Sequence, residues 1–184
     1  MIRALSRLFR RARSEDGTAT IEFVIVVPIV MTIFVASVEA GFYMTKHALM
    51  ERGLDLVMRD IRLGHVGTFG ENKLRKLICD ATPILSDCEN TLMVEMRPVS
   101  TSTFDIPDDP PTCINRGEET KVDDDVEGGV SDEIMIIRIC VVQDPMFPST
   151  GIGLQLRKNR QGGWRDAHGG YQMATASVFV NEPR

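Results

Sequence analysis

The longest apolar run in the chain lies near its N-terminus. Phe23–Val38 carries no charged residue, and the wider stretch Ile21–Tyr43 contains only two, Glu22 and Glu39. At about 1.5 Å per residue, a helix of that length crosses a hydrocarbon core roughly 30 Å thick. The pattern therefore predicts one membrane-spanning helix, which we place over residues 18–43.

After this stretch the pattern changes from continuously apolar to amphipathic. Thr45–Leu63 contains no proline, and its apolar residues recur at 4-3-4 spacing, which places them on one face of a helix. These residues are Met50, Leu54, Val57 and Ile61. We expect the helix to continue to the stop at Gly64 and Gly67, and to pack this face on the rest of its own chain. Pro28 predicts a kink in the apolar half.

The remainder of the chain reads as one short helix followed by strands. Residues 71–80 have a helical apolar face, whereas Leu92–Arg97 alternates with a period of two, typical of a half-buried strand. Ile134–Val142 is rich in β-branched residues and predicts a central strand, and Met173–Val180 predicts a third. The sequence thus predicts an α+β fold, with a long N-terminal helix packed on a small antiparallel sheet.

The flanks of the apolar run predict its orientation. Five arginines precede it, against the two acids Glu15 and Asp16. They are Arg3, Arg7, Arg10, Arg11 and Arg13. An arginine excess on a short N-terminal flank favours a cytoplasmic N-terminus. We therefore expect a cytoplasmic basic leader at 1–17, a transmembrane helix at 18–43 and an extracytoplasmic domain at 44–184.

Two other interpretations of the apolar run are a signal peptide and a plain uncleaved anchor. Val38-Glu39-Ala40 fits a small-residue cleavage pattern, but the run is long for a signal peptide and Glu22 interrupts its start. A plain anchor fits the hydropathy and gives no reason for Glu22. A carboxylate at the centre of a membrane helix costs ~3 kcal/mol, less near the interface, and usually serves a function. Glu22 could also cap its own helix terminus, where negative charge is favourable.

Composition and charge narrow the classes of function. The chain carries a net charge of −5; residues 1–17 contribute five arginines and two acids, or +3, which leaves −8 for the rest. Such an acidic chain argues against nucleic acid as a partner. None of the three histidines, His47, His65 and His168, lies in a motif with a nucleophile. The sequence therefore predicts no catalytic, cofactor-binding or metal-binding residue, and no enzyme activity.

Four cysteines occur in the part of the chain that we expect outside the cytoplasm. Four cysteines allow three pairings, and an oxidising compartment favours disulfides over a metal site, since the chain has no C-x-x-C motif. We predict a short closure between Cys79 and Cys88, and a second bond between Cys113 and Cys140 that tethers the long acidic loop to the sheet.

Three stretches of the chain share one resemblance. At the N-terminus, Gly17 is followed five residues later by Glu22 and Phe23, ahead of the apolar helix. Residues 78–98 form the second stretch, and the ending 174–183, which closes on Asn-Glu-Pro, forms the third. Together they resemble the TadE-like proteins of the Tad (Flp) type IV pilus system. Val180, where we would expect arginine, and the large acidic insertion depart from the family's pattern.

The resemblance implies a pilin-like fold and a structural role as an assembly pseudopilin, or minor pilin. A prepilin peptidase would cut between Gly17 and Thr18, and Glu22 would pair with the new amine of a neighbouring subunit. The chain would sit in the bacterial inner membrane with its C-terminal domain in the periplasm, or enter the extracellular pilus. Its partners would be the lipid bilayer, other pilins and pseudopilins, and the inner-membrane pilus platform. The alternative is a membrane-anchored extracytoplasmic binding or adaptor domain unrelated to pili.

Overall fold

The computed structural model describes residues 18–63, 65, 70–104, 106, 108–117, 125–148, 152 and 170–182. Its helices are α2 (Thr18–Arg62), α3 (Glu71–Ala81) and α4 (Cys88–Thr91), and its strands are β1 (Leu92–Val99), β2 (Asp125–Val126), β3 (Ile134–Gln143) and β4 (Tyr171–Val180). The fold is α+β, as predicted from the alternation of helical and strand periods.

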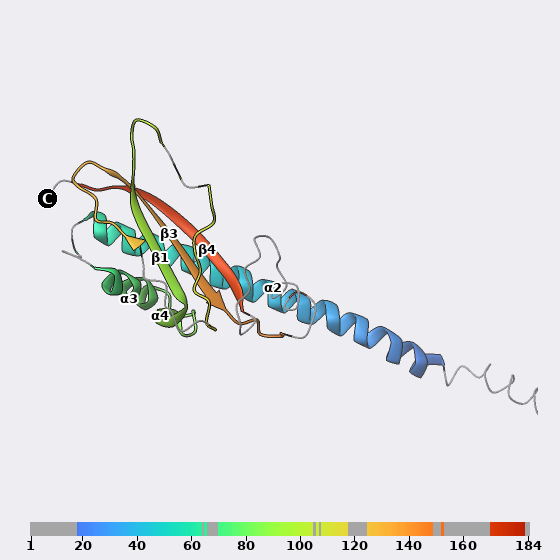
Figure 1. The fold of residues 1–184 in the computed structure, drawn as a ribbon. Helices are drawn as coiled ribbons and strands as arrows, with labels where there is room; N and C mark the ends of the chain where they lie inside the picture. Colours follow the sequence, from blue (N-terminus) through green and yellow to red (C-terminus); the bar gives the residue numbers. More distant parts are fainter. Residues whose placement is uncertain are drawn as a thin grey trace, which may run out of the picture.

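Helix α2 runs for 45 residues without interruption, which confirms the predicted length. Figure 1 shows its C-terminal half lying along the sheet, while its N-terminal half extends well beyond the rest of the molecule. Pro28 lies within the helix, and Thr32 donates its hydroxyl to the Pro28 carbonyl, at 2.7 Å. The kink expected at Pro28 stays a prediction. Two arginines, Arg59 and Arg62, occupy the last turn, where positive charge favours the helix dipole.

The sheet has the strand order β2-β1-β3-β4. β3 is central and pairs antiparallel with β1 on one side and with β4 on the other, in registers that include Val94↔Ile139 and Ile139↔Thr175. The main strands pair antiparallel, as predicted, and the two-residue strand β2 adds a parallel pair with β1, so the sheet is mixed. Two residues are too few to show a period of two, which is why the pattern did not reveal β2.

The core lies between one face of the sheet and the helices α2 and α3. The predicted apolar face of α2 is buried there, as the 4-3-4 spacing required. Gly53 lies on the same side of α2, and a Cβ at this position would collide with the Thr82 side chain at the end of α3. The absence of a side chain at Gly53 therefore lets the two helices approach closely.

The opposite face of the sheet is covered by residues 108–117. Met93 is buried as well as its neighbours Leu92 and Val94, so the start of β1 is buried on both faces, whereas Glu95 and Arg97 further along are only partly buried, as the alternation predicted. Arg138 on β3 forms an ion pair with Glu95 on β1 at 2.5 Å and donates to the Asp109 carbonyl at 2.6 Å. This buried pair crosses from the sheet to the covering segment and holds it in place.

Two disulfides close the domain with the pairing expected from the sequence. Cys79 at the end of α3 is bonded to Cys88 at the start of α4, with the Cα atoms 5.7 Å apart. Cys113 in the covering segment is bonded to Cys140 on β3, with the Cα atoms 5.3 Å apart. The second bond ties residues 108–117 to the centre of the sheet, close to the Arg138 ion pair.

Candidate functional site

The N-terminal half of α2 is an apolar surface that the rest of the described chain leaves uncovered. Ile21, Phe23 and Phe34 are each more than 60% exposed. Among the described residues, α2 is the one helix long and apolar enough to cross a membrane, and its apolar window is not buried in the protein. A contiguous apolar surface of this size marks a contact with lipid or with other proteins.

Glu22 and Phe23 lie side by side in sequence on this exposed part of the helix. Both are exposed, and within the described residues Glu22 has no hydrogen-bond or ion-pair partner. α2 as described begins at Thr18, which places Glu22 beyond the first turn. The favourable effect of a helix dipole on a carboxylate falls off within that turn. The geometry thus gives little support to Glu22 as a cap of its own helix. Gly17 lies outside the described residues.

Glu39, by contrast, is held by the domain. Its side chain is only 2% exposed, although it lies inside the apolar stretch of α2. The backbone N–H of Met146 donates to one carboxylate oxygen at 3.1 Å, and that of Phe147 donates to the other at 2.9 Å. Both donors belong to the segment that follows β3. A carboxylate that accepts two amide hydrogen bonds is well satisfied, so the buried charge fixes this segment against the helix.

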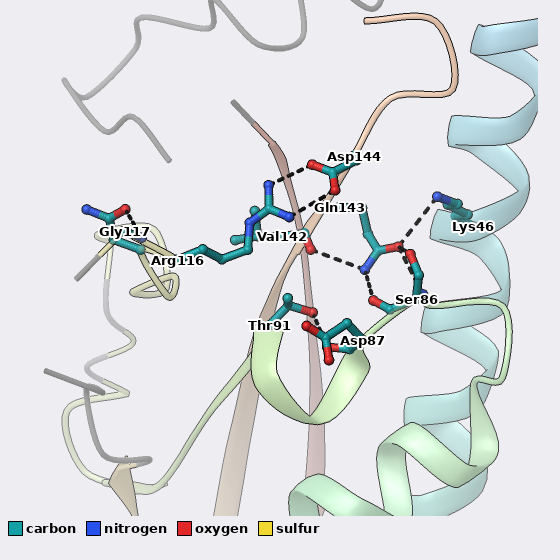
Figure 2. A network of polar contacts seen from close by, with 10 residues as sticks. Lys46, Ser86, Asp87, Thr91, Arg116, Gly117, Val142, Gln143 and Asp144 are labelled. Atoms are coloured by element: carbon teal, nitrogen blue, oxygen red, sulfur yellow. Dashed lines mark hydrogen bonds and ion pairs between the residues drawn. The ribbon is translucent and has the colours of Figure 1, made fainter. Parts of the chain in front are cut away.

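A second polar link joins α2 to the same end of the sheet. Gln143, the last residue of β3, is 1% exposed, and its amide oxygen accepts from the Ser86 hydroxyl at 3.0 Å and from Lys46 on α2 at 3.4 Å. Its amide nitrogen donates to the Ser86 carbonyl at 2.8 Å. Figure 2 shows Gln143 between Lys46 and Ser86, with the neighbouring Asp144 paired to Arg116. The buried amide thus connects α2, β3 and the turn before α4.

Burial at this junction, together with the nearby charges, shifts the pKa values of two side chains. Burial, reinforced by the negative charge of Glu39, raises the pKa of Tyr171 to about 12. Burial lowers the pKa of Lys46 from its usual value, against the opposing effects of the carboxylates of Glu39 and Asp144. The ring of Tyr171 also packs on that of Tyr43, with 5.5 Å between centroids. We call Glu39, Tyr43, Lys46, Gln143 and Tyr171 the junction cluster.

The histidines in the described residues make ordinary structural contacts. His47 lies 3.2 Å from the Ala174 carbonyl of β4 and 3.4 Å from Glu51. His65 lies 3.6 Å from Asp60, and His168 is outside the described residues. No group of three or more His, Cys, Asp or Glu side chains in the described part of the chain is placed to hold a metal ion.

The exposed half of α2, the junction residues that α2 contributes and the start of its buried face lie in one continuous segment. Residues 17–54 match the family described as TadE-like protein. This segment is TadE-like. It includes Gly17, Glu22 and Glu39, and it ends at Leu54 in the core. No curated protein and no solved structure matches the chain.

Sequence reasoning recognised the TadE-like segment and missed the role of Glu39. Glu39 was counted only as one of two charges in the apolar stretch and as part of a possible cleavage pattern. It is the first α2 side chain that the domain buries, four residues before Tyr43, where we expected the span to end. A charge in an otherwise apolar run was the available signal, because such a charge needs a partner. The resemblance seen at 78–98 and 174–183 lies outside the matched segment.

Proposed function

We propose that the chain is an assembly pseudopilin, or minor pilin, of a Tad (Flp) pilus. The observation that carries the proposal is the TadE-like match over residues 17–54, which joins Gly17 to a long apolar helix with exposed side chains. The proposal places α2 in the bacterial inner membrane, the leader in the cytoplasm and the domain in the periplasm. The arginines of the leader support this orientation.

Processing by a prepilin peptidase would prepare the helix for assembly. Cleavage between Gly17 and Thr18 creates an amine four residues from Glu22, about 6 Å along a helix. In a low-dielectric assembly, an amine and a carboxylate attract each other strongly when they pair. Glu22, exposed and without a partner in the described chain, is available to the amine of a neighbouring subunit. The pair would set the register between adjacent helices.

The role is structural and needs no catalytic residue. The exposed side chains of the N-terminal helix half would face lipid in the membrane and neighbouring helices after assembly. The partners would be the prepilin peptidase, other pilins and pseudopilins, and the inner-membrane pilus platform. Entry into the extracellular pilus is the end state of the same assembly. The alternative, an anchored adaptor domain unrelated to pili, requires neither the cut after Gly17 nor the carboxylate of Glu22.

The first test is processing. Full-length chain is produced together with the prepilin peptidase, and the mass of the membrane-bound product is measured. We expect wild type to lose residues 1–17, and Gly17→Val to stay uncut because a side chain there obstructs an extended peptide in the protease. Ala12→Val, a β-branched substitution in the same leader, should be cut normally. Normal shortening of Gly17→Val would overturn the proposed processing.

The second test is assembly, in cells that lack the wild-type copy. Glu22→Ala should insert in the membrane at least as well as wild type, because a costly charge is removed, yet fail to support piliation. Glu22→Gln separates charge from size and should fail as well. Glu51→Ala, which removes an exposed carboxylate from the other half of α2, is the control and should support pili. Full piliation by Glu22→Ala would mean that Glu22 is only a local cap of its helix and that assembly does not need its carboxylate.

A further inference from the structure

The segment that Glu39 holds has an apolar tip. In Pro145–Pro148, Pro145 is buried, Met146 is 49% exposed, Phe147 is half-buried and Pro148 is exposed. None of these four residues carries a charge. We call Pro145–Pro148 the tip. It lies at the end of the sheet from which the uncovered half of α2 extends, since its backbone amides are bonded to Glu39.

The depth of the tip follows from the geometry of the helix. Ala19–Val38 has 20 residues and, at 1.5 Å per residue, spans about 30 Å, the thickness of a hydrocarbon core. If this stretch crosses the bilayer, as the proposed function requires, Glu39 lies at the outer boundary of the core. The backbone amides of Met146 and Phe147 donate hydrogen bonds to Glu39, so the tip lies at the same depth in the bilayer as Glu39.

We infer that the tip is a membrane-contact surface, which rests on the outer leaflet of the bilayer that α2 crosses. The apolar surface of α2 continues past Glu39 to Phe42, which is 43% exposed, and the tip extends that surface sideways. Beyond Glu39, Asp144 before the tip and Lys46 further along α2 are charged residues of the described chain on the domain side, where charged groups remain hydrated. Aromatic and apolar side chains are favoured at this interface.

Glu39 acts as the positioning residue of this surface. Its two oxygens each accept a hydrogen bond from one amide of the tip, and without them those partly buried amides would lose their acceptors. The domain is then fixed to the membrane at two points, the helix and the tip. Contact with the membrane at two points restricts the tilt of the domain relative to the bilayer. A helix alone would leave the domain free to change its tilt.

Tryptophan quenching by brominated lipids tests the inference on the full chain. The single tryptophan is first removed by Trp164→Phe, and one phenylalanine at a time is then replaced. The protein is reconstituted at a low protein-to-lipid ratio in phosphatidylcholine vesicles that carry bromine either near the headgroup or near the end of the acyl chain. Quenching reports how close each tryptophan lies to the bromine.

Three aromatic substitutions sample three depths. Phe34→Trp, in the exposed half of α2, should be quenched by deep bromine. Phe147→Trp should be quenched by shallow bromine. Phe104→Trp is the matched control, because it follows β1 at the opposite end of the sheet, and it should show no quenching. Met146→Trp, at an exposed position of the tip, repeats the measurement in case Phe147→Trp alters folding.

The outcomes separate this inference from the proposed function. Quenching of Phe34→Trp without quenching of Phe147→Trp or Met146→Trp would overturn the membrane-contact surface and leave the anchor standing. No quenching of Phe34→Trp would overturn both. Quenching at Phe147 that disappears as the protein-to-lipid ratio rises would assign the tip to a second copy of the chain. Glu39→Ala should abolish quenching of Phe147→Trp and leave that of Phe34→Trp unchanged. If Glu39 only stabilised the fold, its removal would not produce this difference between the two positions.

Discussion

The two halves of α2 belong to one continuous helix and have opposite surfaces. In residues 19–38 the apolar side chains lie on every face and none of them is buried, whereas in residues 39–62 one apolar stripe is buried and most of the charges on the other faces are exposed. Figure 1 shows the same contrast, with one half covered by the sheet and the other free of it. A helix that is apolar all round requires lipid or other helices around it. A helix with a stripe requires one packing surface, which here is its own domain.

The comparison shows that the period of the apolar pattern identifies what a helix contacts. The chain changes from one pattern to the other at Glu39, which is also the first α2 side chain that the domain buries. The buried charge is therefore the point where the contact with the surroundings ends and the contact with the domain begins. The predictions below compare positions on the two sides of this point.

The largest expected effect is on the buried stripe. Leu54→Ala removes a side chain that is 1% exposed in the core, and such a change costs about 2–5 kcal/mol of the free energy of unfolding. The measurement is denaturant unfolding of the full chain in detergent, followed by circular dichroism. Leu56→Ala, two residues away and 48% exposed, is the matched control and should cost much less. Equal losses at the two positions would mean that the stripe is not the packing surface.

The same experiment extends to the uncovered half. Phe34→Ala deletes a larger side chain than Leu54→Ala, yet in detergent its effect on the unfolding of the domain should be small, because no part of the described domain covers Phe34. A loss as large as that of Leu54→Ala would show that the N-terminal half is part of the domain core and would break the comparison.

The next effect is at the boundary itself. Glu39→Ala leaves the partly buried amides of Met146 and Phe147 without their acceptors, and an unsatisfied group costs about 1–3 kcal/mol when it is fully buried. Water entering the space will recover part of this, so we expect a net loss of about 2 kcal/mol. Glu39→Gln keeps one acceptor oxygen and should lose less. Glu51→Ala, an exposed glutamate on the same helix, should leave the unfolding midpoint almost unchanged. Equal midpoints for Glu39→Ala and Glu51→Ala would contradict the clamp.

Much of this organisation could be predicted because the elements concerned have a residue pattern that repeats along the sequence. The stripe Met50, Leu54, Val57 and Ile61 has a helical period, and the central strand is rich in β-branched residues, so both elements were expected at nearly their observed bounds. The two disulfides followed from the short spacing of one pair and from what remained for the other. Periodic elements can be recognised because many residues carry the same signal.

The unpredicted features depend on single contacts between distant residues. Glu39 accepts hydrogen bonds from residues 107 and 108 positions away, and no local pattern encodes that pairing. The burial of Met93 depends on the segment at 108–117 folding across the sheet, held by Arg138. The candidate site is divided in the same way: Glu22 was identified from its setting in an apolar run, whereas the partner of Glu39 could only be found in three dimensions.

A smaller effect comes from replacing either of two glycines of α2 with alanine. Alanine in place of glycine normally stabilises a helix interior by up to about 1 kcal/mol. At Gly53 the new Cβ would collide with Thr82, which is buried and fixed by a hydrogen bond from its hydroxyl to the Ile78 carbonyl, at 2.7 Å. We expect Gly53→Ala to destabilise the domain by about 1–2 kcal/mol through overpacking.

Gly41 supplies the matched control, because a Cβ there would meet nothing within 4 Å. Gly41→Ala should therefore leave the unfolding midpoint unchanged or raise it. The two variants make the same chemical change in the same helix, so opposite signs would place the close contact at Gly53 alone. A stabilising Gly53→Ala would show that α3 can move away from α2 without cost.

The smallest expected effect is the titration of Tyr171. Its pKa is raised from 10.0 to about 12, first by burial and then by the charge of Glu39. Between these values the unfolded chain binds fewer protons than the folded one, so the stability that Tyr171 contributes is complete below pH 10 and falls as the pH rises toward 12. We expect a loss of about 1 kcal/mol or less at pH 11, after allowing for solvent screening.

Phenolate absorbance measures this titration directly, because the chain has only two tyrosines. Tyr43→Phe leaves Tyr171 as the sole phenol, and its titration in the folded protein should lie well above that of the same variant unfolded in denaturant. Glu39→Gln in this background removes the second cause and keeps the first, so it should lower the pKa of Tyr171 only in part. Unchanged titration would mean that Glu39 does not act electrostatically at the junction. A titration that falls to the unfolded value would mean that the clamp also keeps Tyr171 buried, so that the boundary residue of α2 maintains the packing of the domain above it.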